Sequence, residues 1–253
     1  MTEKNTISSI EKAVDILEIL SRENNKSIRS LGEDLGITKS TLHRILKTLE
    51  IRGLVRKDSS TEKYTLGYKI LELSTHLSLQ NDLRNIALEH MKKLADATKE
   101  TVQLAVIDHE NILVIETVEG YGQLRVYAKA GEKYPITYGN FGKVFLSKEN
   151  DLDNISKWIE KYPLQQYASK SIMDQKEYIK HIKEVKENKI SIGIDDPIEG
   201  AISIAVPIEN KWGDIIAVLA IAGVKTEDKL NNLDELMTQV KQYGVKITQE
   251  LGK

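Results

Sequence analysis

The chain has 253 residues, enough for one or two domains, and its 40% apolar and 29% charged residues are ordinary for a soluble globular protein. It contains no cysteine, which excludes disulfide scaffolds, thiolate zinc sites and cysteine nucleophiles. The longest apolar run, Ile215 to Ala222, is far shorter than the roughly 18 residues of a membrane helix. Charges interrupt the apolar positions near the N-terminus, unlike in a signal peptide. We therefore expect a cytoplasmic protein with no membrane partner.

Charge is distributed unevenly along the chain. The net charge is −2, yet residues 1–70 contain 13 Lys and Arg against 10 Asp and Glu. Within residues 38–57 there are six basic residues and a single acid, Glu50. A basic cluster of this kind indicates a polyanionic partner such as nucleic acid, although the same run can also be a solvated helix face.

Helical spacing dominates the first third of the chain. Apolar residues three and four positions apart predict one helix over 10–20 and a short second helix over 27–35. Gly36 follows directly, where a chain reversal needs a positive φ angle. A third helix is predicted to begin after Thr38, which can cap it, and to end at Gly53.

A β-hairpin and a further helix follow. The segments 54–57 and 63–66 flank turn-forming residues, which predicts the hairpin. The next helix is predicted over 68–81. It suits a linker that pairs two copies of the chain, although its apolar residues can equally pack on their own domain. Those apolar residues are Ile70, Leu73 and Leu77.

From residue 101 onward, strand and helix patterns are interspersed. Alternating or β-branched segments predict strands at 101–107, 112–118, 124–128, 190–194, 201–208 and 214–221. Helical spacing predicts helices at 151–162, 174–188 and 229–251. Strands grouped around a central helical stretch favour an antiparallel or mixed sheet with helices packed on it, an α+β arrangement.

Three helices with a tight glycine turn, a basic third helix and a hairpin form the layout of a winged helix-turn-helix. The third helix must pack its apolar stripe on the first two and expose the opposite face to the DNA major groove. The outward positions that remain are Lys39, Ser40, Thr41, His43, Arg44 and Lys47. Any three-helix domain with a polar surface would show similar residues, which is the competing interpretation.

These side chains suit DNA in different ways. Arg44 can contact a guanine in a bidentate manner, and Thr41 and His43 can read base edges. The other three, Lys39, Ser40 and Lys47, suit phosphate contacts. The hairpin tip would form the wing, lying along the backbone or the minor groove, with Arg56, Lys57, Ser59, Ser60 and Lys63.

The segment from Ser30 to Ser74 resembles the DNA-binding domain of IclR-type transcriptional regulators. TKSTLHR at 38–44 matches the family pattern position by position, as does YTLG at 64–67, where the wing ends. The resemblance continues through ETVQLAV at 100–106, Gly142-Lys143, and the segments 200–207 and 217–223. It therefore spans nearly the whole chain.

The resemblance implies a two-domain α+β regulator, more often a repressor than an activator, of a catabolic operon. Residues 1–67 would form the winged helix-turn-helix, 68–81 the linker and dimerisation helix, and 82–253 an effector-binding domain with a GAF/PAS-like mixed sheet. It implies a dimer or dimer of dimers on palindromic double-stranded operator DNA and, as effector, a small organic acid, sugar acid or aromatic metabolite. The implied DNA contacts are Thr38, Lys39, Ser40, Thr41, His43, Arg44, Lys47, Arg56, Lys57 and Lys63.

The resemblance also implies an effector pocket, formed by Asn140, Phe141, Gly142, Asp195, Ser203, Ala220 and Ala222. Family members that bind small carboxylates commonly have Gly-Ala, Asp, Cys and two Ser in such a pocket. Here Asn-Phe and two Ala stand instead, so hydroxyl donors that a carboxylate needs are lost and an apolar ring is added. We hypothesise a ligand that is less polar than glyoxylate- or pyruvate-like acids, or differently shaped. Alternatively, Phe141 is core packing and the pocket is vestigial.

An enzymatic role has little support in the sequence. The five histidines are scattered without a zinc-binding spacing, and no Gly-x-Ser-x-Gly elbow occurs. Gly142-Lys143 is predicted to start a helix rather than to bind phosphate, because it lacks the flanking residues of a P-loop. The adjacent acids Asp195 and Asp196 are interpreted as a solvated turn. We expect no catalytic residue, metal or cofactor; a ligand-independent architectural DNA-binding protein is the main alternative.

Overall fold

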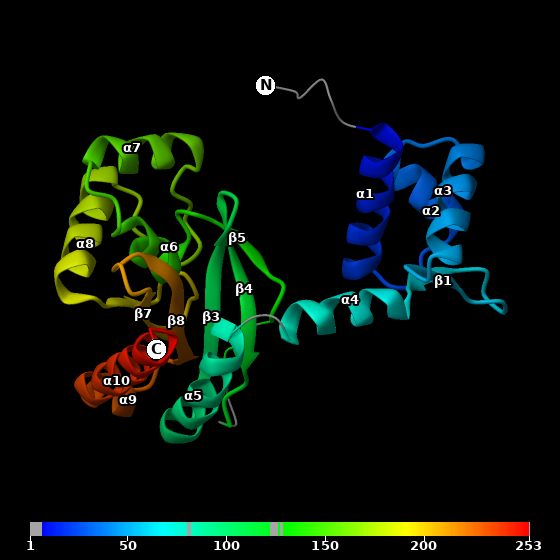
Figure 1. The fold of residues 1–253 in the computed structure, drawn as a ribbon. Helices are drawn as coiled ribbons and strands as arrows, with labels where there is room; N and C mark the ends of the chain where they lie inside the picture. The colour runs from blue at the N-terminus through cyan, green and yellow to red at the C-terminus, as the bar shows by residue number, and fades with distance from the viewer. Residues whose placement is uncertain (1–6, 80–81, 122–125, 127–128, 253) are drawn as a thin grey trace. The chain divides into compact units, whose positions relative to one another are not determined.

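The chain forms two compact units, Met1–Gln80 and Asn81–Lys253, which are described separately. The structure is a computed structural model that describes residues 7–79, 82–121, 126 and 129–252. Figure 1 shows the helices and strands of each unit. The side chains of residues 77–79 lie outside the description.

The first unit consists of three helices, a two-stranded antiparallel hairpin and a fourth helix (Figure 1). Its elements are α1 (Ser8–Arg22), α2 (Ile28–Leu35), α3 (Lys39–Ile51), β1 (Val55–Lys57), β2 (Tyr64–Leu66) and α4 (Tyr68–Leu79). The predicted helices and hairpin are thus confirmed, with boundaries shifted by one or two residues. The core of the unit is formed by Ile16, Leu20, Leu31, Leu42, Leu46 and their apolar neighbours.

The turn between α2 and α3 fixes how the third helix is presented. The Ser27 hydroxyl accepts a hydrogen bond from the Ser30 amide and caps α2, and Gly36 ends it with a φ of 61°. Thr38 stands at the N-cap of α3, as predicted, but its side chain does not cap the helix backbone. Its hydroxyl instead donates to the Thr41 hydroxyl at 3.0 Å, because the two side chains share one turn of the helix.

The second unit is built around a six-stranded sheet in which every described pairing is antiparallel, in the order β5-β4-β3-β8-β7-β6. Its strands are β3 (Thr101–Asp108), β4 (Asn111–Val118), β5 (Lys133–Pro135), β6 (Ser191–Ile194), β7 (Ala201–Glu209) and β8 (Ile215–Val224). Its helices are α5 (Asp82–Thr98), α6 (Gly139–Leu146), α7 (Leu152–Lys161), α8 (Gln175–Asn188), α9 (Glu227–Asn231) and α10 (Leu233–Leu251). The predicted α+β class is confirmed.

Several details of the second unit differ from the sequence-based expectations. The strand β5 was not predicted, and the predicted strand over 124–128 lies, apart from Val126, outside the described residues. Gly142-Lys143 does not start a helix, since it lies inside α6, which begins at Gly139. The last predicted helix is two helices, α9 and α10, which are separated at Asn232.

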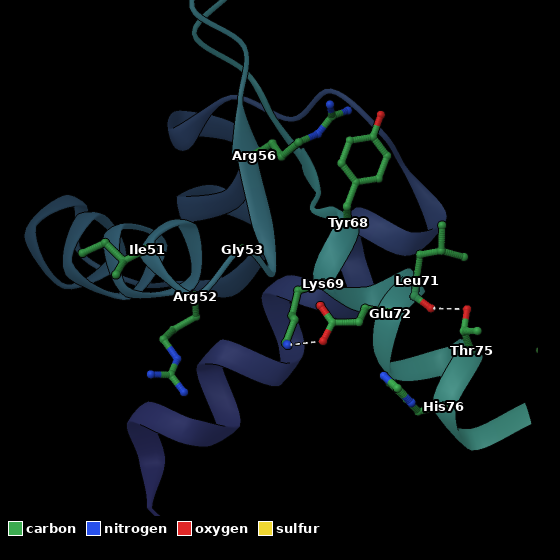
Figure 2. A pocket seen from close by; sticks show the side chains of 10 residues that line it. All are labelled: Ile51, Arg52, Gly53, Arg56, Tyr68, Lys69, Leu71, Glu72, Thr75 and His76. Carbon is green, nitrogen blue, oxygen red and sulfur yellow. Dashed lines mark hydrogen bonds and ion pairs between the residues drawn. The ribbon is translucent and has the colours of Figure 1, made fainter. Parts of the chain in front are cut away.

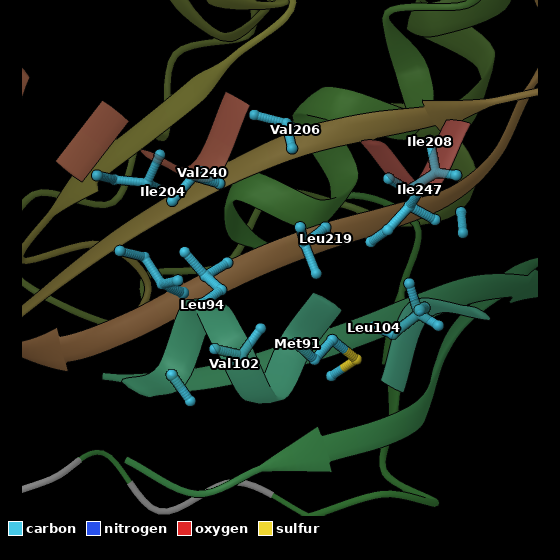
Figure 3. Packing of buried hydrophobic residues seen from close by; sticks show 14 of the residues in the cluster. Met91, Leu94, Val102, Leu104, Ile204, Val206, Ile208, Leu219, Val240 and Ile247 are labelled. Atoms are coloured by element: carbon cyan, nitrogen blue, oxygen red, sulfur yellow. The ribbon is translucent and has the colours of Figure 1, made fainter. Parts of the chain in front are cut away.

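Apolar side chains cover both faces of the sheet. On one face α5 and α10 pack against the strands, and Figure 3 shows this core around Met91, Leu94, Val102, Leu104, Ile204, Leu219, Val240 and Ile247. On the other face, α6 packs on β6, β7 and β8, α8 packs on α6, and α7 packs on α8, in one apolar cluster that includes Phe141, Val144, Phe145, Ile155 and Ile182. On the central strands β3 and β8, side chains that point to either face of the sheet are therefore mostly buried.

Candidate functional site

The first candidate site is the outward face of α3. Leu42, Ile45, Leu46 and Leu49 are buried against the other helices, so the polar positions between them face away from the core. Thr41 is half-buried. The exposed predicted contacts of this helix and its N-cap are Thr38, Lys39, Ser40, His43, Arg44 and Lys47.

Arg44 and Lys47 differ in their ion-pair partners among the described residues. The Lys47 ammonium lies 3.4 Å from the Glu50 carboxylate one turn later. Among the described residues, no carboxylate forms an ion pair with Arg44. The α3 face therefore presents an uncompensated guanidinium beside small hydroxyl side chains, which is the chemistry that reads a guanine edge.

Lys47→Ala is expected to weaken binding to all DNA sequences by a similar factor and to lower the salt slope of binding by about one. The reason is that an ammonium that neutralises one phosphate releases one counterion, whatever the sequence. Titrations on one specific and one random duplex at several salt concentrations check this. A loss confined to the specific duplex would contradict the phosphate role.

The hairpin tip is held by Asp58. Its carboxylate accepts hydrogen bonds from the Ser60 hydroxyl and amide and from the Thr61 amide, which lower the pKa of Asp58 to about 2. The Lys57 ammonium pairs with Glu62 across the turn. Lys63 is exposed and forms no ion pair among the described residues. The predicted wing is thus an ordered turn with an unpaired cation next to it.

Arg56 is engaged with the start of α4. Its guanidinium lies 4.7 Å from the centroid of the Tyr68 ring, in the orientation of a cation–π contact (Figure 2). Behind this contact is a hollow of about 760 Å³ within the first unit. It is lined by Ile51, Arg52, Gly53, Arg56, Tyr68, Lys69, Leu71, Glu72, Thr75 and His76. Figure 2 shows that these residues come from the end of α3, the wing and α4.

The second candidate site is a small cavity in the second unit, of about 50 Å³. It lies between α6 and the strands β3, β7 and β8. Five of the residues predicted for the effector pocket line it: Asn140, Phe141, Ser203, Ala220 and Ala222. Gly142 and Asp195 do not line it. The lining residues that the sequence did not point to are Gln103, Val126, Tyr134, Tyr138, Pro197, Ile198 and Ile221.

The side chains of Asn140 and Ser203 are hydrogen-bonded to each other. The Asn140 amide nitrogen donates to the Ser203 hydroxyl at 2.6 Å and to its carbonyl at 3.2 Å. The Asn140 carbonyl oxygen accepts from the Ser191 hydroxyl at 2.8 Å. This close approach requires glycine at 193, where a Cβ would lie 2.7 Å from the Asn140 amide nitrogen and 2.3 Å from the Asp196 carbonyl. The network ties α6 to β6 and β7 below the cavity.

The acidic pair beside the cavity is buried, so its interpretation as a solvated turn is wrong. The Asp196 carboxylate accepts from the Lys143 ammonium at 2.8 Å and from the Ser171 hydroxyl at 3.0 Å. Asp195 pairs with Lys225, and this ammonium holds the pKa of the Asp195 carboxyl below its usual range. Lys143 is equally buried and is committed to Asp196. The two ion pairs fix the loop that carries Pro197 and Ile198 to the cavity wall.

Two stacked tyrosines form the aromatic wall of the cavity. The rings of Tyr134 and Tyr138 lie 4.1 Å apart and nearly parallel, and Tyr167 meets Tyr138 edge-on at 4.8 Å. Burial raises the pKa of Tyr138 to about 12 and that of Tyr134 further, so both phenols keep their protons at neutral pH. The wall offers flat apolar area to a ligand rather than a charge.

The part of the chain that the structure describes contains neither a candidate metal site nor a candidate membrane-spanning helix. There, no three His, Asp or Glu side chains lie close enough together to hold a metal ion. Over the same residues, no helix combines the length and the apolar character that a membrane crossing requires.

Comparison with known proteins decides the family. The family model described as the IclR helix-turn-helix domain matches residues 9–59. The model described as the bacterial transcriptional regulator IclR C-terminal domain matches residues 76–249. The chain belongs to the IclR family. It is therefore a DNA-binding transcriptional regulator, and its relatives are regulators rather than enzymes.

Individual relatives of this IclR-family chain extend over nearly its full length. The transcriptional regulator KdgR of Escherichia coli K12 is 29% identical over 248 residues, 98% of this chain and 94% of the relative. The E. coli K12 repressor AllR is 24% identical over 235 residues, 90% of this chain and 86% of the relative.

Among solved structures, a regulator from Alicyclobacillus acidocaldarius has a TM-score of 0.86 at 24% identity, covering 98% of this chain and all of the other. An IclR homologue from Microbacterium hydrocarbonoxydans, solved with 4-hydroxybenzoate, has a TM-score of 0.83 at 20% identity, covering 96% of this chain and 98% of the other.

Proposed function

We propose that this IclR-family chain represses a catabolic operon by binding palindromic operator DNA, and that a small organic metabolite releases it by binding in the cavity of the second unit. The observation that carries the proposal is this cavity itself. It is enclosed by α6, β3, β7 and β8, and five of the seven residues that the family resemblance implies for the effector line it.

The DNA part of the proposal rests on α3 and the wing. We assign base reading to Thr41, His43 and Arg44, because these side chains stand on the outward side of α3 and offer both donors and acceptors. The phosphate contacts are assigned to cations and hydroxyls around them: Thr38, Lys39, Ser40, Lys47, Arg56, Lys57 and Lys63.

The effector part assigns ligand contact to Phe141, Ala220, Ala222 and the Asn140–Ser203 pair. These residues come from elements far apart in sequence and converge on one cavity. A small organic acid, a sugar acid or an aromatic metabolite remains the broad class of effector. A structural neighbour solved with 4-hydroxybenzoate, and relatives named as a repressor or a regulator, support effector control and repression.

The spacing of the operator half-sites and the exposed apolar side chains of α4 support a dimer or a dimer of dimers. Two recognition helices must sit about 34 Å apart to enter successive major grooves, which one chain cannot provide. In α4, Leu71 and Leu73 are 64% and 52% exposed, while Ile70 is half-buried. The side chain of Leu77, the third residue of the predicted stripe, lies outside the described residues. We assign the exposed face of α4 to contact with a second copy.

Phe141→Ala is expected to change ligand selectivity toward bulkier molecules. The ring is 7% exposed and forms part of the cavity wall, so its removal enlarges the cavity. Loss of the buried ring should also cost about 3–5 kcal/mol of stability. Isothermal titration of wild type and variant with ligands of increasing size checks the shift. Unchanged affinity and selectivity would show that Phe141 is core packing only.

The experiment that tests the proposed function measures operator binding with and without metabolites. The purified chain is bound to operator fragments, and fractions of a cell metabolite extract are added. Release of the DNA by a fraction, abolished in the cavity-filling variant Ala220→Leu, is the expected result. Binding that no fraction alters would favour a ligand-independent architectural protein, and tighter binding would favour an activator.

A further inference from the structure

Gln103 is a largely buried polar residue in the wall of the cavity. It lies in β3, is 7% exposed, and lines the cavity together with Ala220, its neighbour on β8. Among the described residues, no side chain or backbone group hydrogen-bonds to its carboxamide. An amide that makes no hydrogen bond to the described residues can pair with a polar group of a ligand that enters the cavity, and covering it without such a pairing would cost free energy.

Among the described residues, a second polar atom without a partner lies on β4 opposite Gln103, outside the cavity lining. Thr117 stands opposite Gln103 in the register of β3 and β4, and directly opposite residues lie on the same face of a sheet. The Thr117 hydroxyl is buried and has no hydrogen-bond partner among the described residues. A β-bulge interrupts the register at Leu104 and Ala105, immediately after Gln103. Bulges of this kind re-aim side chains beside binding sites.

Three of the other polar side chains on the cavity wall, those of Asn140, Ser203 and Tyr134, already have hydrogen-bond partners, whereas the Tyr138 hydroxyl has none among the described residues. Asn140 and Ser203 are bonded to each other, to Ser191 and to the backbone. No charged residue is among the described cavity-lining residues, and the nearby ammonium of Lys143 is held by a buried carboxylate. A ligand carboxylate would lose its water here without gaining a counterion, which is costly.

We propose that the carboxamide of Gln103 is the polar anchor of the effector. The effector class it selects is an uncharged aromatic molecule whose carboxamide or hydroxyl both donates and accepts a hydrogen bond. This proposal rests on the proposed effector role of the cavity and narrows it. A glutamine side chain donates from its nitrogen and accepts at its oxygen, so it pairs with a group of the same kind.

The walls of the cavity fit the rest of such a molecule. The stacked Tyr134 and Tyr138 rings offer a flat surface on one side, and the small side chains of Ala220 and Ala222 leave space on the sheet. The space of about 50 Å³ is below the roughly 150 Å³ of a cavity that holds benzene. Binding of an aromatic ligand therefore requires residues of the cavity wall to move apart. Ile198, which is 40% exposed, lies in the loop that forms part of this wall.

Two probes of matched shape separate the uncharged ligand from the anion. Binding of 4-hydroxybenzamide and of 4-hydroxybenzoate to the full chain is measured by isothermal titration calorimetry. We expect the amide to bind at least about tenfold tighter than the carboxylate. Equal or tighter binding of the carboxylate, or no binding of either probe at millimolar concentration, would overturn the proposal.

Three variants then test the anchor itself. Gln103→Leu keeps the side-chain volume and should weaken the amide probe by about tenfold or more, while the melting temperature of the free chain stays the same or rises. Gln239→Leu is the matched control, since Gln239 lies on α10, on the opposite face of the sheet. It should leave probe binding unchanged.

The third variant, Ala220→Leu, fills the cavity and distinguishes the two levels of the proposal. If Ala220→Leu abolishes probe binding and Gln103→Leu does not weaken it, the cavity binds ligands but Gln103 is not the anchor. If probe binding survives Ala220→Leu, the cavity is not the effector site and the proposed function fails as well. A lower melting temperature of Gln103→Leu without probe would also contradict the anchor, since it would indicate a structural role.

Discussion

Asp196→Ala is expected to destabilise the second unit by about 3–5 kcal/mol. The substitution leaves the Lys143 ammonium, whose side chain is 4% exposed, without its counterion in an apolar interior. The Ser171 hydroxyl loses its acceptor at the same time. Urea unfolding followed by a probe in the second unit measures the change.

The control for Asp196→Ala is an exposed ion pair in the same unit. Asp108 lies 2.6 Å from the Lys133 ammonium, whose side chain is 55% exposed. Removal of a solvent-exposed pair typically changes stability by less than about 1 kcal/mol, so Asp108→Ala should be nearly neutral. Equal losses in the two variants would show that the Lys143–Asp196 pair does not hold the cavity wall in place.

Arg44→Ala is expected to weaken binding to the operator by about 1–3 kcal/mol, which is roughly a 5- to 150-fold loss, and to relax the preference at one base pair. Its guanidinium is exposed on α3 and unpaired among the described residues, so it is free to contact a base edge. Competition between a specific and a random duplex, followed by selection of bound sequences, measures both effects.

Arg22→Ala provides the matched control for Arg44. Arg22 is an exposed arginine at the end of α1, outside the proposed DNA surface, and it pairs with Glu18 on the same helix at 3.6 Å. It should leave both operator affinity and base preference unchanged. Equal losses on specific and random DNA in Arg44→Ala would contradict its base-reading role and leave it as a phosphate contact.

The recognition helix could be predicted from sequence because its unit buries one side of it. The spacing of Leu42, Ile45, Leu46 and Leu49 defined both the helix and, by subtraction, its outward face. Gly36 with its positive φ marked the turn before the helix. Each signal is local in sequence, so one chain is enough to find it.

The same reasoning fails in the second unit, because its sheet is covered on both faces. Alternation along β3 suggests that a polar residue faces solvent, whereas Gln103 faces a cavity. The helix α6 is buried at all eight positions, so it has no amphipathic spacing that would mark its start at Gly139. Hydrophobic periodicity identifies an element by its single buried face, so it cannot show that Gln103 faces a cavity or that α6 begins at Gly139.

Long-range ion pairs also have no local signal. Asp195 and Asp196 look like a solvated turn in sequence, but their partners Lys225 and Lys143 are 30 and 53 positions away. The cavity depends on such contacts, since it gathers side chains from α6, β3, β7 and β8. Five of its residues could be named from a family resemblance, and none from spacing alone.

Sequencing of the genomic DNA fragments that the purified full chain retains at near-physiological salt tests the central claim most directly. Operator recognition by α3 and the wing predicts one enriched palindrome, with half-sites about one helical turn apart, and loss of that enrichment in Arg44→Ala. The neighbouring genes would then indicate which metabolites to test. Retained fragments with no common sequence, or no retention even after a metabolite extract is added, would contradict sequence-specific regulation by this chain.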